Sequence, residues 1–89
     1  MSDADRSRYL ALEFLRLLSA PEFRQFLVPE RQLCDVVAAA VVPRPTQAEL
    51  TETLQRLERD GHLAGAPATS LAPARWKITE LGRLALLGV

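Results

Sequence analysis

Nine side chains in this 89-residue sequence have types suited to one chemistry, contact with a phosphate backbone and with the base edges beside it. Guanidinium and ammonium groups neutralise phosphates, whereas glutamine and threonine side chains exchange hydrogen bonds with base edges. The nine are Arg44, Thr46, Gln47, Thr51, Gln55, Arg56, Arg59, Arg75 and Lys77. They predict a binding surface only if the elements that carry them present them on one side of the folded chain.

Catalytic and metal-binding patterns are weak in this sequence. The single histidine, His62, follows a glycine and is interpreted as a surface turn residue, and no second histidine or cysteine is placed to share a metal. A glycine-rich phosphate loop is also missing from the sequence. Cys34 lies in an apolar stretch, where a small buried side chain is expected. We therefore predict no enzyme activity, no metal site and no cofactor.

Composition predicts one small globular domain over residues 1–89. Hydrophobic residues make up 48% of the chain, and eleven basic residues balance eleven acidic ones, so any cationic surface has to be local. A chain of this length buries only ~60 to 65% of the surface that it exposes when unfolded. No apolar run is long enough for a membrane span, and the first ten residues do not resemble a signal peptide. We expect a soluble, cytoplasmic protein without membrane contacts.

The first half of the chain predicts two helices after a disordered start at residues 1–4. The first helix covers 5–18 and ends near Ser19, ahead of Pro21. Residues 23–27 fit either a short helical turn or a brief edge strand, and we favour a turn followed by a strand of about three residues. A second helix covers 29–42. Its apolar stripe is Leu33, Val36, Val37, Ala40 and Val41.

A third helix is predicted over 46–60, directly after a turn that contains two prolines. Thr46 and Glu49 have the spacing of a capping box, and Gly61 is suited to end the helix. Its inward positions are Leu50, Leu54 and Leu57. Its outward positions include Glu52, Gln55, Arg56 and Arg59. A helix that follows such a turn is the one that helix-turn-helix proteins place in the DNA major groove.

The last third of the chain predicts a hairpin over 62–78 and a final helix over 79–87. Two antiparallel strands, 63–66 and 75–78, would bring Trp76 to an apolar face and Arg75 and Lys77 to the other. Thr79 caps the final helix, and Gly82 would allow a close approach to another element. The residues expected to make apolar contacts there are Leu81, Leu84, Ala85 and Leu87.

Two phrases in the second half of the chain are similar to those of bacterial winged helix-turn-helix regulators of the MarR and PadR kind. They are "LTETLQRLERDGHL" at 50–63 and "RWKITELGR" at 75–83, in which Ile78, Thr79 and Gly82 occupy the characteristic positions. The likeness covers roughly residues 29 to 83. A looser likeness is to small winged-helix proteins of Mu-like prophages.

The resemblance implies a mainly α winged helix-turn-helix fold with about four helices and a two- or three-stranded antiparallel sheet. It also implies a sequence-specific double-stranded DNA-binding protein, a small bacterial or phage transcription regulator that places helix 46–60 in the major groove. The alternative function is a winged-helix module that binds another protein without binding DNA. We expect a homodimer through the first and last helices. The residues that exceed what one small core can bury are Leu12, Leu15, Leu86 and Leu87.

Overall fold

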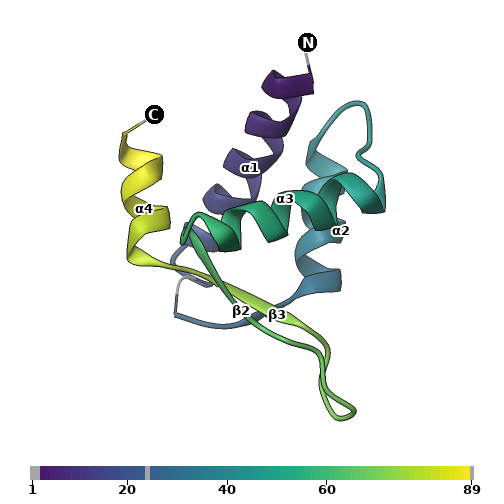
Figure 1. The fold of residues 1–89 in the computed structure, drawn as a ribbon, viewed down its shortest axis with the longest axis vertical. Helices are drawn as coiled ribbons and strands as arrows, with labels where there is room; N and C mark the ends of the chain where they lie inside the picture. Colours follow the sequence, from purple (N-terminus) through teal and green to yellow (C-terminus); the bar gives the residue numbers. More distant parts are fainter. Residues whose placement is uncertain (1–2, 24, 89) are drawn as a thin grey trace.

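The computed structural model describes residues 3–23 and 25–88, which form four helices and one three-stranded antiparallel sheet. In chain order the elements are α1 (Asp3–Ser19), β1 (Val28–Pro29), α2 (Glu30–Ala40), α3 (Gln47–Arg59), β2 (Leu63–Ala66), β3 (Arg75–Ile78) and α4 (Glu80–Leu87). The helices gather above the sheet, and the β2–β3 hairpin projects away from them (Figure 1). The predicted fold class, mainly α with a small antiparallel sheet in a winged-helix arrangement, is confirmed.

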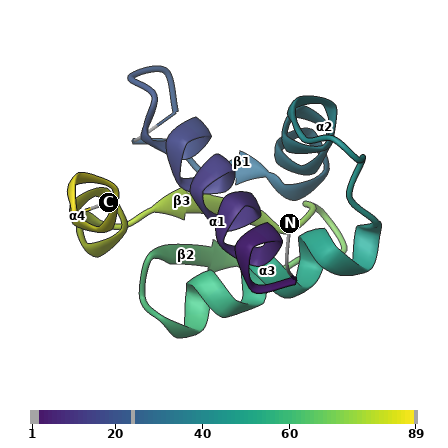
Figure 2. The same ribbon diagram turned by 90° about the horizontal axis from the view of Figure 1, so that it is seen from above.

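Helix α1 lies over the sheet, with α2 and α3 beside it. Helix α4 lies at the other end of the sheet from α2 (Figure 2). Helix α1 begins at Asp3, so the predicted disordered start is wrong for Asp3 and Ala4, while residues 1 and 2 lie outside the described part of the chain. Acidic side chains at Asp3 and Asp5 favour this earlier start, because they interact well with the positive end of the helix dipole. The helix ends at Ser19, as predicted.

The face of α2 that packs against the core differs from the predicted apolar stripe. Its buried residues, together with the following Val41, are Leu33, Cys34, Val37, Ala38 and Val41. Val36 is 47% exposed and Ala40 is also exposed, so both predicted positions were wrong. Both stripes have helical spacing, which is why periodicity could not separate them. A contact from outside the helix favours the observed face, since the Trp76 indole Nε1 donates a 3.0 Å hydrogen bond to Glu30 at the start of α2.

Helix α3 begins with the predicted capping box. The Glu49 backbone N–H donates to Thr46 Oγ1 at 3.1 Å, and the Thr46 N–H donates to Glu49 Oε1 at 3.0 Å. The helix ends at Arg59, and Gly61 adopts a φ of 79°, a left-handed conformation that favours glycine. Local sequence therefore predicted both ends of this helix to within a residue.

The hairpin has the predicted antiparallel strands, and in it Leu63 lies opposite Ile78 and Ala66 opposite Arg75. Strand β1 pairs with the other edge of β3, but it is two residues long rather than about three, because α2 begins immediately after Pro29. Trp76 and Leu54, both predicted core residues, are buried. Cys34 is buried too, as expected.

Helix α4 packs through Gly82 and Leu86, and its other leucines are exposed. Gly82 is buried, and a side chain there would overlap the His62 carbonyl oxygen, so the predicted close approach is confirmed. The expectation of apolar contacts from the predicted leucines is wrong for three of them, because a glycine face turned inward turns the opposite face outward. The exposed residues are Leu81 at 59%, Leu84 at 54% and Leu87 at 81%. Leu86 packs partly against the core.

Candidate nucleic-acid interface

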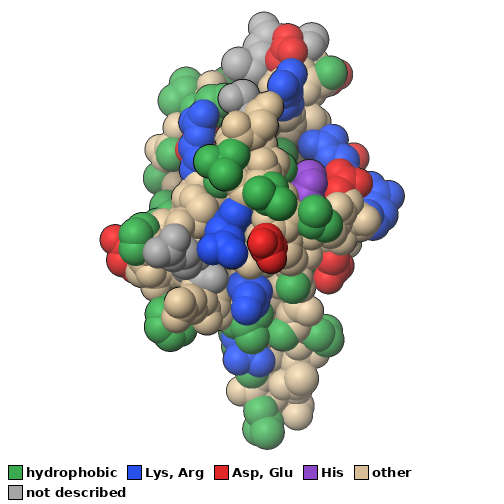
Figure 3. Space-filling model, turned by 90° about the vertical axis from the view of Figure 1, so that its left-hand side faces the viewer, with side chains coloured by type: hydrophobic (Ala, Val, Ile, Leu, Met, Phe, Trp, Pro, Cys, Tyr) green, Lys and Arg blue, Asp and Glu red, His purple; other side chains and the backbone are tan. Residues whose placement is uncertain are grey.

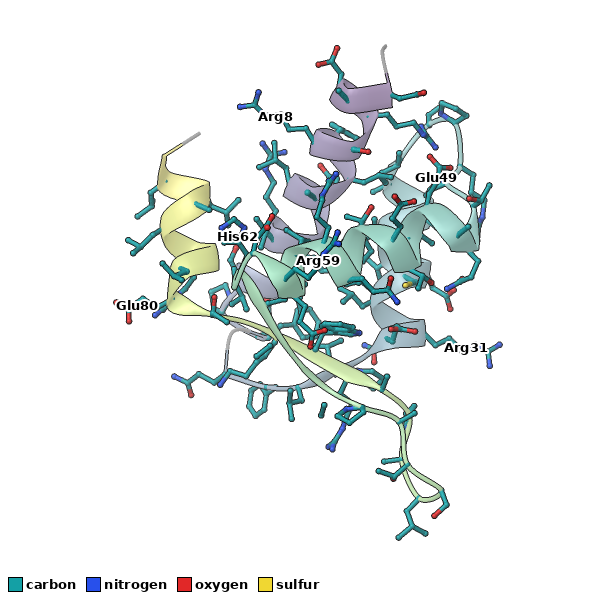
Figure 4. All side chains as sticks on the ribbon, viewed as in Figure 1. Arg8, Arg31, Glu49, Arg59, His62 and Glu80 are labelled. Atoms are coloured by element: carbon teal, nitrogen blue, oxygen red, sulfur yellow. The ribbon has the colours of Figure 1, made fainter. Side chains whose placement is uncertain are left out.

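The side of α3 that faces α1 carries two of the three acidic residues of the helix, Glu49 and Glu52. Glu49 Oε2 accepts a 2.7 Å hydrogen bond from Arg6 Nε of α1, and the same guanidinium donates to the Pro43 carbonyl at 2.9 Å. Glu52 lines a small depression between α3 and α1, together with Ser7 and Glu49. Figure 4 shows Glu49 extending from α3 towards the start of α1 and the loop before α3. The acids of the leading turns thus lie away from the hairpin.

The Glu49 carboxylate is held in its charged form by its contacts with Arg6 and Thr46. The pKa of Glu49 is lowered to about 2, first by the hydrogen bond from Arg6 and then by the backbone N–H of Thr46. The same contact raises the pKa of Arg6. One carboxylate therefore caps α3 and joins it to α1, and its charge is balanced locally. Glu49 would therefore repel an incoming phosphate less than an unpaired carboxylate would.

A second face of α3 carries a row of polar residues, of which Gln55 borders the hairpin. Gln47, Thr51, Gln55 and Arg59 recur at intervals of four residues, a spacing that places them along one face of the helix. We call these four residues the polar strip. Gln47 Nε2 donates to Thr51 Oγ1 at 3.3 Å, and Gln47, Gln55 and Arg59 are exposed.

A shallow groove separates the polar strip from the hairpin. It has a volume of about 360 Å³ and is lined by Gln55 and Glu58 from α3 and by hairpin residues that include Ala66, Pro67 and Trp76. Gly65 forms part of the wall, since a Cβ at that position would come within 2.8 Å of the Trp76 ring. The groove contains one acid, Glu58, which sequence analysis did not single out.

The predicted cations do not share one face. Arg44, in the turn before α3, and Arg59, at the end of the polar strip, are both exposed. Arg56, predicted on the outward face, is instead half-buried and donates to the Ser7 carbonyl of α1 at 3.3 Å. The structure records no ion pair between Arg56 and Glu52, although it describes both residues. Of the five predicted cations, Arg56 is therefore committed to a contact within the fold, and Arg44 and Arg59 are the exposed ones.

Arg75 and Lys77 lie on the outer face of the sheet. Their neighbours in β3, Trp76 and Ile78, are buried against the helices, and alternation along the strand points Arg75 and Lys77 the other way. Lys77 lines a pocket of about 530 Å³ with Arg83 and Glu80 of α4 and with Gln25. Figure 3 shows a column of basic side chains down this side of the molecule, with an acidic side chain next to it.

Two contributors to these surfaces were missed from the sequence. Arg83 joins Lys77 only because Gly82 brings α4 against the start of β2, and nothing in the spacing of 77 and 83 indicates this. Arg6 looked like a residue on the polar side of the first helix, yet its partner is 43 residues away in the chain. Thr46 was predicted as a contact residue and is found as the cap of α3.

Comparison of the chain with protein-family models, curated proteins and solved structures finds no significant match. Among the described residues, no helix has the length and apolar character needed to cross a membrane. Within the same residues, no group of three or more histidine, cysteine or acidic side chains is arranged to hold a metal ion.

Proposed function

We propose that this protein binds double-stranded DNA, with the polar strip of α3 in the major groove and the hairpin alongside it, as a small transcription regulator. The observation that carries this proposal is the division of α3 into two sides. On the side next to the hairpin, Gln55 is accompanied by one acid, Glu58, whereas Glu49 and Glu52 line the depression facing α1. A helix inserted from the hairpin side would present amides to base edges without bringing Glu49 and Glu52 to the phosphates.

Phosphate contact in this arrangement comes from the two exposed cations at the ends of the polar strip. Arg44 precedes Gln47 by three residues, and Arg59 follows Gln55 by four. Each phosphate that is neutralised steepens the fall of log affinity with log salt by ~0.9. Two contacts per chain give a modest slope, so we expect the homodimer to double it. The apolar face for such a homodimer is on α4, because Leu15 is buried in the core and Leu12 is half-buried.

The test compares two arginines of α3 that lie three residues apart. Arg59→Ala should flatten the salt dependence of binding to mixed duplex DNA by roughly one unit. Arg56→Ala should leave this slope unchanged, because the Arg56 guanidinium is half-buried and hydrogen-bonded to the Ser7 carbonyl of α1, whereas Arg59 is exposed. Gln55→Ala should relax sequence preference by ~1 to 3 kcal/mol at one base pair.

The acids of α3 give a second matched pair. Glu58 lines the groove beside Gln55, whereas Glu52 lies on the α1 side, so Glu58→Gln should strengthen non-specific binding more than Glu52→Gln. Fluorescence anisotropy at two salt concentrations measures all of these effects. A wild-type affinity weaker than about 0.1 mM near physiological salt would remove the DNA proposal.

A protein-binding module is the second candidate function, and the exposed leucines of α4 favour it. Leu81, Leu84 and Leu87 form an apolar face on a helix that contacts α1 but leaves this face open. Exposed apolar patches rimmed by polar residues mark protein contacts. Sedimentation tests whether this face binds a second copy of the chain: a dimer that dissociates on Leu84→Glu supports self-association, and a 9.9 kDa species at tens of micromolar contradicts it.

A further inference from the structure

The tip of the hairpin is a preformed turn that makes its own hydrogen bonds. Thr69 Oγ1 accepts from the backbone N–H groups of Leu71 at 3.2 Å and Ala72 at 3.1 Å, and the Thr69 N–H donates to the Ala72 carbonyl at 2.8 Å. Pro67 and Pro73 restrict the backbone on either side of the turn. The tip lies at one end of the molecule, beyond the paired strands (Figure 1). Its shape is therefore set before it meets any partner.

This turn presents one large apolar side chain to solvent. Leu71 is 95% exposed, more than any other large hydrophobic residue of the described chain. Its neighbours Ser70 and Ala72 are small, and the sequence has no charged residue from 63 to 74. Single exposed leucines are common on protein surfaces. A leucine at the apex of a self-supporting, uncharged projection is different, because only this side chain can fill a narrow space that the tip enters.

We propose that Leu71 enters the minor groove of the duplex read by α3 and wedges between two base pairs. The inference rests on the proposed DNA-binding function, and it assigns the hairpin a role that phosphate contact cannot explain. The minor groove is about 6 Å wide, which suits a turn with small flanking side chains. Apolar side chains inserted there unstack a base step and bend the duplex by ~20 to 90° towards the major groove.

The position of the hairpin supports contact with the same duplex. The groove lined by Gln55, Ala66 and Pro67 joins the polar strip directly to the base of the projecting loop. Trp76 holds this base in place, since its ring lies against Gly65 and its Nε1 is bonded to Glu30 of α2. The loop is therefore attached to a rigid frame next to α3, and a helix in the major groove brings the tip towards the flanking minor groove.

The experiment uses a duplex that the wild-type protein selects from a random pool, with 2-aminopurine placed at flexible steps beside the selected site. The wedge predicts that wild-type protein raises 2-aminopurine fluorescence at one step and bends the duplex in an energy-transfer assay. Leu71→Ala should abolish both signals and weaken binding about tenfold. Phe26→Ala is the control, because Phe26 is 62% exposed and lies in the loop before β1 rather than in the hairpin.

Leu71→Lys distinguishes a wedge from a simple contact with the backbone. A lysine at the tip can reach a phosphate, so the salt dependence should steepen by ~0.9 while the fluorescence and the bend disappear. Because Leu71 makes no core contact, both variants should melt at the wild-type temperature. Wild-type binding without unstacking or bending, or equal signals from Leu71→Ala, overturns the wedge and leaves the DNA proposal intact. Failure of the wild-type protein to select any duplex overturns both.

Discussion

Replacing Gly82 with alanine should destabilise this domain, although the same change in most helices is stabilising. A Cβ at Gly82 would overlap the His62 carbonyl oxygen and come within 2.8 Å of Ile78 Cγ1. The His62 carbonyl also accepts the Thr79 N–H at 3.1 Å, and Thr79 Oγ1 donates to the Gly61 carbonyl at 2.6 Å. The first turn of α4 is thus held against the start of β2, and neither backbone can move apart without losing one of these bonds.

The expected magnitude follows from three contributions. Alanine in place of glycine within a helix gains ~1 kcal/mol of intrinsic helix propensity. Overpacking a tight contact costs ~1 to 3 kcal/mol, and loss of the Thr79–His62 hydrogen bond costs ~1 kcal/mol more. The free energy of unfolding should therefore fall by ~1 to 3 kcal/mol. That is a large part of the ~5 to 15 kcal/mol typical of a folded domain.

Urea unfolding followed by the fluorescence of Trp76, the single tryptophan, measures this change. Gly88→Ala is the control, because a Cβ there would meet nothing closer than Leu84 O at 3.7 Å. If α4 swings away while the core stays folded, the Trp76 transition is unchanged and the α4 amides lose protection from hydrogen exchange. Gly82→Ala that unfolds at or above the wild-type midpoint, with the α4 amides still protected, would refute the argument.

Three further predictions concern the core and its ionisable groups. Trp76→Ala should lower the free energy of unfolding by ~3 to 5 kcal/mol, and near-parental melting followed by circular dichroism would contradict the placement of the hairpin. The pKa of Glu49 is about 2 in the folded chain against an ordinary 4.5, so its stabilising contribution is complete above pH 4.5 and disappears towards pH 2. Urea midpoints of wild type and Glu49→Gln should therefore converge over that interval, and a constant gap would argue against the Arg6–Glu49 pair. Cys34 is 4% exposed, and burial raises its pKa to about 11. A thiol reagent at pH 8 should therefore reach it only when the protein opens, and rapid reaction in the native state would contradict its burial.

The local elements of this fold were readable from the sequence because their determinants lie within a few residues of one another. The Thr46–Glu49 capping box, the Thr79 cap and the left-handed Gly61 each depend on hydrogen bonds or dihedral angles inside one turn. Strand β3 followed from the alternation of Trp76 and Ile78 with Arg75 and Lys77. For these features, the residue types leave few competing conformations.

The sequence could not predict in the same way which face of each helix packs against the core. In α2, the observed stripe and the predicted stripe have the same spacing, and the bond from Trp76 to Glu30 joins residues 46 positions apart. In α4, leucines at helical spacing predict a buried face. The contact of Gly82 with His62 turns them outward.

The candidate interface depended on contacts of this second kind. The types and spacing of Gln47, Thr51, Gln55 and Arg59 were visible in the sequence, but the groove between Gln55 and the hairpin was not. Glu49 and Arg56 face α1 because Arg6 and the Ser7 carbonyl are there to meet them, across 43 and 49 residues of chain. Helical periodicity determines which residues share a face of a helix. Which element that face packs against is decided by contacts between residues far apart in the chain.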